Sequence, residues 1–451
     1  MSGYAEYREV NLPWLKAVPA HWEIRRNKNI FTEQKEIVGE RSADYTLLSL
    51  TLNGIIPRDM DGGGKFPESF DKYKIVKNGD MAFCLFDIDE TPRTVGLSGY
   101  NGMLTGAYTI MRVSNINARF IYYYYLALDN GKMLRPLYTG LRKTININTF
   151  QSTKVPVPPR EEQDQIVRFL DWKVSSINKL INIKKKEIKA IDALKRSMVS
   201  HAITRGLTTD APMKDSGVKW LGDIPAHWKI TKLRQILHPV SEKNHPEFPL
   251  LSVVREQGVI LRDVEDKEAN HNFIPDDLSG YKVVRKGQFA MNKMKAWQGS
   301  YGVSDYTGIV SPAYFIFDIA FENLEYFHYA IRSKVYVNFF AQASDGIRVG
   351  QWDLQMDKMK EIPFIVPPAD EQIAIVKYIK QALPQYDAAI EKLTEEVAVL
   401  EEYKNKVIAD AVTGKIDVRG IEIPEYEFVD EDNDNVDENL EQGADEPPEE
   451  E

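Results

Sequence analysis

Four side chains between positions 293 and 298 could together contact nucleic acid. Lys293, Lys295, Trp297 and Gln298 directly follow an apolar stretch that is typical of a strand. Lysine can contact phosphate or guanine, and glutamine can pair with the N6 and N7 atoms of adenine. The alternative is a solvated loop in which the indole packs inward. We therefore treat these four residues as candidate DNA contacts.

A second group of cations follows a glycine at two matching places in the chain. Arg142 and Lys143 lie in one place, and Arg348 with Gln351 in the other. A cation presented just after a glycine turn suits a phosphate contact, which positions a duplex without reading its sequence. The alternative is an ion pair within the domain. Further candidates are Arg58, Lys65 and Arg262, as cations of exposed turns. Arg93 is a candidate as the only cation of CLFDIDETPRTVG (84–96), the segment of the first copy that is equivalent to the region around 293–298.

No catalytic residue is predicted in this chain. The sequence lacks the [DN]PP[FY] motif of amino-methyltransferases, and it lacks the GxxxxGK[ST] phosphate loop. Its seven histidines show no HExxH spacing, and Cys84 is the only cysteine, so no metal site and no internal disulfide are expected. These absences favour a binding protein over an enzyme.

The elements that carry the candidate residues occur twice, because the chain is a tandem duplication. VPAHWEI (18–24) recurs as IPAHWKI (224–230), and GLSGYNGMLTGAYTI (96–110) recurs as GVSDYTGIVSPAYFI (302–316), both at an offset of 206. VPPREEQDQIV (157–167) recurs as VPPADEQIAIV (366–376) at an offset of 209. The intervening segments diverge. A repeated framework around divergent inserts indicates one scaffold that presents two different recognition surfaces.

Each repeat is expected to contain a strand-rich domain followed by a long helix. Residues 23–150 and 229–350 are rich in β-branched and aromatic residues, with a strand–turn–strand pattern at 73–83 and a helix around 120–129. The paired histidine and tryptophan at 21–22 and 227–228 stand at the same place in both copies. Identical residues cannot read different sequences, so we interpret the tryptophans as anchors for the domain–helix junction.

The two helices carry apolar residues in alternating steps of three and four, which predicts a coiled coil. Pro384 is expected to kink or restart the second helix. Two copies of one unit tend to pack about a pseudo-two-fold axis, which makes the helices antiparallel. About 40 residues at about 1.5 Å each give a rod of roughly 60 Å with a domain at either end. The predicted core positions are Leu170, Val174, Ile177, Ile181, Ile188, Ile191, Met198, Ile379, Leu383, Ile390, Leu393, Val397, Leu400 and Val407.

The net charge of −10 is concentrated at the C-terminus. Residues 430–451 contain 12 acidic and no basic residues, which leaves +2 for residues 1–429. The tail has little apolar content and is predicted to be disordered. No stretch is long and apolar enough for a transmembrane helix, and the N-terminus has no signal-peptide core. A cytoplasmic location is expected.

The ordered, duplicated set of motifs resembles the specificity subunits of type I restriction-modification systems. The resemblance rests on the PAHW segments at 19–22 and 225–228, the Glu-Gln pairs at 162–163 and 371–372, and the stretch NKMKAWQGS at 292–300. It covers nearly the whole chain except the acidic tail. The fold class implied is α+β, with two tandem target-recognition domains, mixed α/β with strand-rich cores, on two long antiparallel helices.

The resemblance also implies the division of the chain. It places target-recognition domain 1 at 1–157, a central helix at 158–207, target-recognition domain 2 at 208–366, a C-terminal helix at 367–420 and an acidic disordered tail at 421–451.

The function implied is that each domain reads one half of a bipartite, asymmetric site in double-stranded DNA. The helices would set the spacing and dock two modification (methyltransferase) subunits, which use S-adenosylmethionine, and restriction subunits that use ATP and Mg²⁺ could then join. The chain itself would hold no cofactor. Two alternatives stay open: a coiled-coil scaffold that does not bind DNA, and the recognition half of a stand-alone restriction-methylation enzyme.

Overall fold

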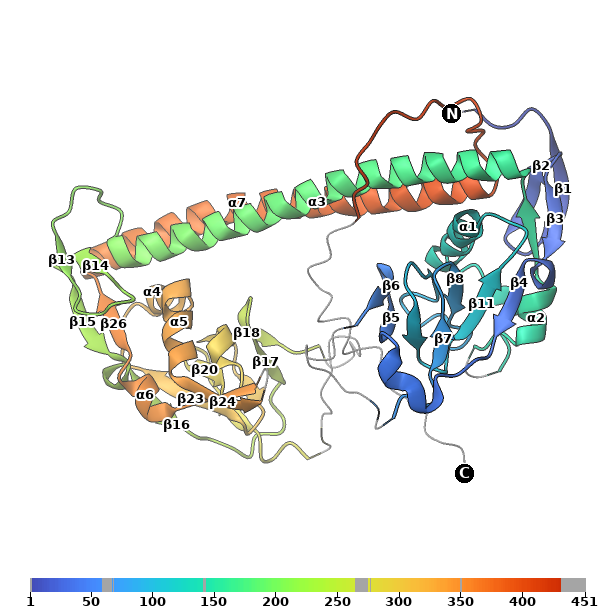
Figure 1. The fold of residues 1–451 in the computed structure, drawn as a ribbon. Coiled ribbons are helices and arrows are strands. Elements are labelled where there is room, and N and C mark those ends of the chain that lie inside the picture. The colour runs from blue at the N-terminus through green and yellow to red at the C-terminus, as the bar shows by residue number, and fades with distance from the viewer. Residues whose placement is uncertain are drawn as a thin grey trace. The chain divides into compact units, whose positions relative to one another are not determined.

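The computed structural model describes residues 2–58, 67, 69–140, 143–263, 275, 277–348 and 351–430. The chain divides into two compact units. Unit 1 contains residues 1–186 and 393–451, and unit 2 contains residues 187–392. The division falls within the two long helices, so each unit holds one strand-rich domain and one part of each helix (Figure 1).

Unit 1 is built around a four-stranded antiparallel sheet in the order β4–β11–β8–β9. Its strands are β4 (Phe31–Gln34), β11 (Thr109–Val113), β8 (Asp80–Phe83) and β9 (Val95–Leu97). Four further antiparallel pairs surround this sheet. They are β1 (Tyr7–Leu12) with β2 (Leu15–Pro19), β3 (Glu23–Arg26) with β12 (Lys154–Val157), β5 (Leu48–Thr51) with β6 (Gly54–Pro57), and β7 (Lys74–Val76) with β10 (Gly102–Leu104).

Unit 2 repeats this topology with the sheet β16–β23–β20–β21. Its strands are β16 (Leu237–Val240), β23 (Tyr314–Ile319), β20 (Phe289–Asn292) and β21 (Tyr301–Val303). The pairs are β13 (Met213–Asp215) with β14 (Asp223–Pro225), β15 (Lys229–Lys232) with β26 (Pro363–Val366), β17 (Leu251–Val254) with β18 (Gly258–Leu261), and β19 (Lys282–Val284) with β22 (Gly308–Val310). A fifth hairpin, β24 (Ser344–Arg348) with β25 (Gln351–Leu354), precedes the last short helix.

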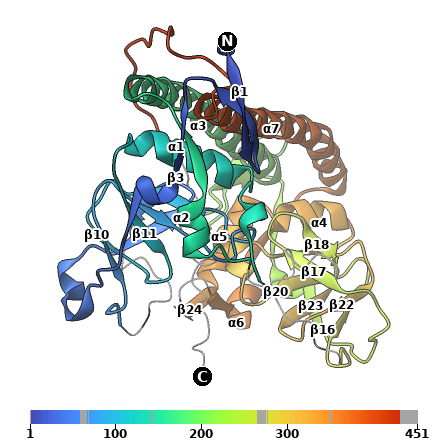
Figure 2. The ribbon, with the colours of Figure 1, turned by 90° about the vertical axis from the view of Figure 1, so that its right-hand side faces the viewer.

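Short helices complete each domain. Unit 1 has α1 (Ala118–Asn130) and α2 (Ile147–Ser152), and unit 2 has α4 (Leu324–Ile331), α5 (Lys334–Gln342) and α6 (Met356–Lys360). Asn117 caps α1 by accepting hydrogen bonds from the N–H groups of residues 119 and 120. Helix α1 lies between the sheet and the long helix (Figures 1 and 2), and Phe120, Tyr124 and Tyr125 are fully buried there. The expected helix around 120–129 and the strand–turn–strand at 73–83 are confirmed.

The two long helices are α3 (Arg160–Arg205) and α7 (Ala369–Val412), and they pack antiparallel within each unit. Lys184 Nζ lies 3.0 Å from Glu396 Oε2 in unit 1, and Lys195 Nζ lies 2.5 Å from Asp387 Oδ1 in unit 2. None of the fourteen predicted core positions is exposed. Helix α7 is continuous through Pro384, so the expected restart of the helix at this residue is not observed.

Glycines end both long helices earlier than the sequence suggested. Gly206 and Gly414 have φ angles of +73° and +74°, which L side chains rarely adopt. A Cβ atom at Gly206 would lie 3.0 Å from the Trp228 ring, and one at Gly414 would lie 3.1 Å from the Trp22 ring. The helices therefore stop at 205 and 412 instead of 207 and 420, because the chain must turn tightly against these indoles.

The chain after α7 differs from the expectation of disorder from residue 421. Residues 421–430 contact α3 at several points, and Ile421 and Ile423 pack on the hydrophobic core of unit 1. Side chains of α3 hydrogen-bond the backbone of residues 427–430, which composition alone cannot reveal. Residues 431–451, the rest of the acidic tail, lie outside the described residues.

Candidate nucleic-acid interface

The repeated histidine–tryptophan pairs join each domain to a long helix. In unit 1, Glu162 of α3 accepts hydrogen bonds from Trp22 Nε1 at 2.9 Å and Tyr4 Oη at 2.5 Å, and its other oxygen lies 2.7 Å from His21 Nε2. In unit 2, Glu371 of α7 accepts from Trp228 Nε1 at 2.9 Å and contacts His227. Both indoles are 1% exposed. Both junctions thus use a glutamate of the long helix that contacts the histidine and accepts a hydrogen bond from the tryptophan.

In unit 2, two segments that are far apart in the sequence meet beside the central sheet. One is the loop at 292–300 that follows β20, and the other is the β24–β25 hairpin. The rings of Trp297 and Trp352 stack with centroids 4.9 Å apart and an interplanar angle of 25°. Lys293 Nζ lies 2.8 Å from Asp353 Oδ2. These contacts hold the hairpin against the loop.

This contact region keeps an accessible aromatic and cationic surface. Trp352 is 37% exposed, and the Lys293 side chain is 35% exposed despite its ion pair. Lys295 is exposed and Gln298 is half-buried in the same loop. An indole can pack on a thymine methyl group, while the lysines suit phosphate or guanine. The arrangement could thus contact both the edge and the backbone of a duplex.

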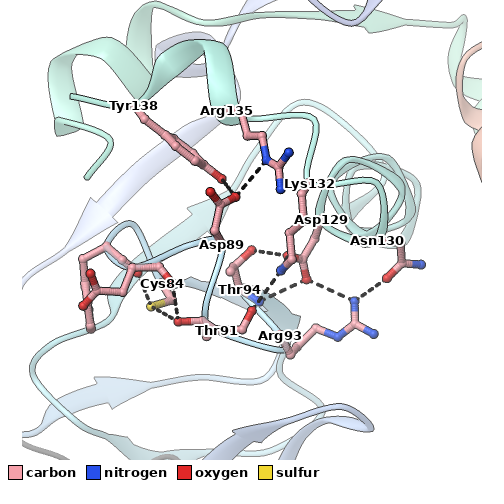
Figure 3. Close-up of polar contacts among 12 residues, drawn as sticks. Cys84, Asp89, Thr91, Arg93, Thr94, Asp129, Asn130, Lys132, Arg135 and Tyr138 are labelled. Carbon is pink, nitrogen blue, oxygen red and sulfur yellow. Dashed lines mark hydrogen bonds and ion pairs between the residues drawn. The ribbon is translucent and has the colours of Figure 1, made fainter. Parts of the chain in front are cut away.

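In unit 1, the matching segments meet through ions instead of indoles. The loop at 84–94 follows β8, and the segment at 135–144 precedes α2. Asp89 of the loop accepts hydrogen bonds from Arg135 Nε at 3.0 Å and Tyr138 Oη at 3.2 Å (Figure 3), and Lys143 Nζ lies 3.4 Å away. Desolvation acts to raise the pKa of the Asp89 carboxyl, but the bonds from Arg135 and Lys143 outweigh it and lower the pKa. Arg135 and Lys143 stay accessible, with side chains 66% and 41% exposed.

Arg93 occupies a different position from the one expected of a DNA contact. Its Nη1 atom donates to the buried Asp129 carboxylate at 3.1 Å and to Asn130 at 2.7 Å, and its side chain is 14% exposed (Figure 3). Thr94 and Lys132 complete the partners of Asp129. Arg93 therefore ties the loop to α1, and its assignment as a DNA contact is corrected to an internal ion pair.

The remaining candidates are only partly described. Arg58 is half-buried, and its backbone N–H donates to the Leu47 carbonyl. Lys65 and Arg142 lie outside the described residues. Arg348 and Gln351 are the ends of β24 and β25, so the backbone places them on the same hairpin as Trp352, but their side chains are not described.

Sequence reasoning missed the partners in the second segment of each domain. Trp352, Asp353 and Arg135 were not singled out, although Trp352 directly follows the candidate Gln351. One sequence signal could have found them. The residues before and after the matching motifs Gly140-Leu-Arg142 and Gly346-Ile-Arg348 differ between the two copies, as expected of residues that read different sequences. The pairing itself could not be predicted, because Trp297 and Trp352 are 55 residues apart in the sequence and no local pattern encodes a contact over that separation.

Over the part of the chain that the structure describes, no group of three or more histidine, cysteine, aspartate or glutamate side chains is placed to hold a metal ion. Cys84 is buried beside Thr91 (Figure 3), and burial raises the pKa of its thiol. Within the same described residues, no helix combines the length and apolar character needed to cross a membrane.

Comparisons with known proteins agree with this architecture. Residues 70–190 match the type I restriction modification DNA specificity domain. The specificity subunit of the type I restriction enzyme MjaVIII from Methanocaldococcus jannaschii is 24% identical over 446 residues, covering 92% of this chain and 98% of that protein. The putative type I restriction enzyme MjaX specificity subunit of the same organism is 23% identical over 435 residues, covering 89% and 95%.

A solved structure of a type I restriction-modification system has a similar fold. One of its chains superposes with a TM-score of 0.56 at 13% identity, covering 88% of this chain and 99% of that one. The sequence matches and the similar fold agree on one class of protein that this chain resembles, the type I DNA-specificity proteins. Within that class, the chain is similar to the specificity subunits of type I restriction enzymes.

Proposed function

We propose that each of the two domains reads one half of a bipartite, asymmetric DNA site. The observation that supports this most directly is the pair of matching contact regions. In each unit, the loop after the second sheet strand in the chain (β8 or β20) meets the segment before the last short helix, and there the two copies use different side-chain chemistry. Unit 2 uses stacked indoles and a lysine–aspartate pair, and unit 1 uses an aspartate bound by arginine, lysine and tyrosine.

The two contact regions would recognise DNA with different side chains. In unit 2, Trp352 would pack on a base edge, while Lys293 and Lys295 would contact phosphate or guanine. In unit 1, Arg135 and Lys143 would supply the cations, held in place by Asp89. Different side chains on the same backbone framework would give two different half-sites.

The long helices and the partner subunits would complete the activity. We infer that α3 and α7 set the spacing between half-sites and dock two modification subunits that methylate adenine with S-adenosylmethionine. Restriction subunits that use ATP and Mg²⁺ would join the same assembly in the cytoplasm. This chain would then contribute recognition and no catalytic group, which agrees with the non-catalytic role of specificity subunits.

The experiment that tests this proposal is methylome sequencing of DNA from cells that express this chain with its modification subunit. We expect one split motif, with methylated adenine in each half, that is lost when the chain is omitted. Exchange of residues 23–150 or 229–350 for those of a relative should change one half only. A folded, assembled complex without any methylated motif would contradict the proposal.

A further inference from the structure

The chain beyond α7 is bound to α3 in unit 1 by side chains of the helix (Figure 1). Gln165 Nε2 donates to the Ile421 carbonyl at 2.8 Å, and Ser175 Oγ donates to the Glu427 carbonyl at 3.0 Å. We call residues 418–430 the C-terminal segment. The helix holds this segment through its backbone.

Two buried asparagines of α3 hold the end of the C-terminal segment. Asn178 Nδ2 donates to the Val429 carbonyl at 3.3 Å, and Asn182 Nδ2 donates to the Asp430 carbonyl at 2.9 Å. Both asparagines are 6% exposed. Lys404 Nζ of α7 donates to Asn178 Oδ1 at 3.3 Å, so one cation already adjoins this end.

The contacts follow one face of α3 and run in the direction of the helix. Ser175, Asn178 and Asn182 meet residues later and later in the C-terminal segment. They are three and four positions apart, which places them on one face. The same spacing leads next to Lys185 and Lys186, of which the first is half-buried and the second is exposed. The chain after the C-terminal segment is therefore directed towards a pair of lysines.

The length of chain agrees with this direction. From Gln165 to Asn182 the helix rises about 26 Å, and the residues after Ile421 up to the contact with Asn182 can span at most about 32 Å. The C-terminal segment therefore has little slack along α3. Lys186 lies about 6 Å further along the helix, which two more residues of chain can reach. Those residues, 431–432, are glutamate and aspartate.

The charges of the two stretches are complementary. Residues 172–186 of α3 contain five lysines and no acidic residue. Residues 431–438 contain five acidic residues and no basic one. An acidic chain that is directed along a lysine-rich helix face gains from ion pairs that it forms without a further loss of translational freedom.

The second copy of the helix has neither feature. With the offset of 209, Ser175 corresponds to Pro384 and Asn182 to Glu391, which cannot donate to a carbonyl when ionised. The α7 stretch 381–395 contains one lysine and three acidic residues. The hydrogen-bond donors and the lysines thus occur together in α3 and are absent together in α7, which indicates that they serve one site.

We propose that residues 431–438 continue along α3 and bind Lys185 and Lys186, and that they thereby close this lysine surface to the phosphate groups of DNA. A lysine neutralises a phosphate of any duplex irrespective of its sequence. The acidic residues occupy the same cations and so restrain sequence-independent binding. Only this consequence rests on the proposed DNA recognition, since the binding of residues 431–438 to α3 is a property of the chain alone.

The binding to α3 is tested on the full chain with a zero-length carbodiimide cross-linker, which joins a lysine amine to a carboxylate. Mass spectrometry should find residues 431–438 linked to Lys185 and Lys186 at least fivefold more often than to Lys392 and Lys406, two exposed lysines of α7. Salt at about 1 M should remove this preference, because the Debye length falls to about 3 Å. Equal linkage to all four lysines would overturn the inference.

The consequence is tested by binding to a random-sequence duplex. Deletion of residues 431–451 should tighten this binding at least threefold and steepen its salt dependence by a slope of about 2, since two lysines gain phosphate contacts. Lys185→Gln combined with Lys186→Gln should abolish the gain. The control, Lys392→Gln combined with Lys406→Gln, removes the same charge and should leave the gain intact.

The outcomes separate specific binding from general charge repulsion. An equal gain in the Lys185→Gln and Lys186→Gln variant would show that the acidic residues act only through net charge, and would overturn the inference, as would no gain at all. Unchanged hydrogen exchange in the sheet of unit 1 verifies that each variant is folded. A chain that binds no DNA with or without residues 431–451 would overturn the proposed function, whereas the cross-links would still decide the binding to α3.

Discussion

Trp352 and Arg93 show how burial separates a candidate base contact from an internal ion pair. Trp352 presents 37% of its surface to solvent, stacked on Trp297 in the contact region of unit 2. Arg93 lies in the equivalent loop of unit 1, but its guanidinium is bound to a buried carboxylate. A side chain can read DNA only if its functional atoms are accessible. Truncation of Trp352 should therefore weaken DNA binding, whereas truncation of Arg93 should lower the stability of the fold.

Trp352→Ala should weaken binding to the half-site read by unit 2 by about 1–3 kcal/mol, the range for one base contact. It should also relax the methylated motif at one position of that half, as methylome sequencing would show. The control is Trp220→Ala, since Trp220 is 58% exposed in the same unit but outside both contacting segments. An unchanged motif with Trp352→Ala would rule out a reading role for this indole.

Arg93→Ala should lower the free energy of unfolding by about 1–3 kcal/mol, because Asp129 loses a charged partner while it stays buried. The folded variant should bind DNA with unchanged affinity and an unchanged dependence on salt. Thermal denaturation and a salt series of binding measurements check the two expectations. A reduced salt slope in the folded variant would show that Arg93 contacts phosphate after all.

At the scale of elements, α4 is attached to β21 through a histidine that favours the neutral state. The Val303 N–H donates to His328 Nδ1 at 3.3 Å. Burial and the neighbouring Arg332 lower the pKa of His328 to about 4, although Asp305 and Glu325 act in the opposite direction. Arg332 is itself held in place by the Tyr301 and Glu256 carbonyls. The attachment of α4 should therefore depend on pH.

We expect unit 2 to lose stability as the pH falls below about 6.5. The unfolded chain then binds a proton at His328 that the folded chain does not bind, so the contribution present above the unfolded pKa is lost towards pH 4. The loss at pH 5 relative to pH 7 should be about 1–2 kcal/mol. Denaturant unfolding of His328→Gln at both pH values should show a smaller difference. An equal difference in both proteins would contradict this assignment.

At the scale of the whole molecule, the long helices connect the two recognition domains. Helices α3 and α7 are each continuous across the division between the units. A helix rises about 1.5 Å per residue, so a matched insertion of one heptad lengthens each by about 10 Å and preserves the a/d pattern. If the helices set the spacing of the half-sites, their length should translate directly into base pairs.

Insertion of seven residues after position 186 and after position 392 should lengthen the spacer by about three base pairs, at about 3.4 Å each. Both half-sites should keep their sequences, because neither contact region changes. Methylome sequencing provides the measurement. A spacer of unchanged length in a folded, active variant would show that the helices do not determine the spacing.

The duplication, the coiled-coil pattern and the tryptophan junctions could all be derived from the sequence. Each depends on a local or periodic pattern, such as the a/d spacing in α3 or the repeated PAHW segment, and the matching α7 positions follow by a constant offset. The strand–turn–strand at 73–83 follows for the same reason, since β-branched residues around a glycine turn specify it within eleven residues.

The contact regions and the binding of residues 418–430 to α3 were decided only by the tertiary structure. The stack of Trp297 on Trp352 and the binding of residues 427–430 to α3 join segments separated by 55 and about 250 residues. The acidic composition after residue 421 predicted disorder, because it offers little apolar surface to bury. Residues 418–430 are instead held by hydrogen bonds from the side chains of Gln165, Ser175, Asn178 and Asn182 to their backbone, and backbone groups are the same in every sequence. Only the fold determines which of them meet a donor.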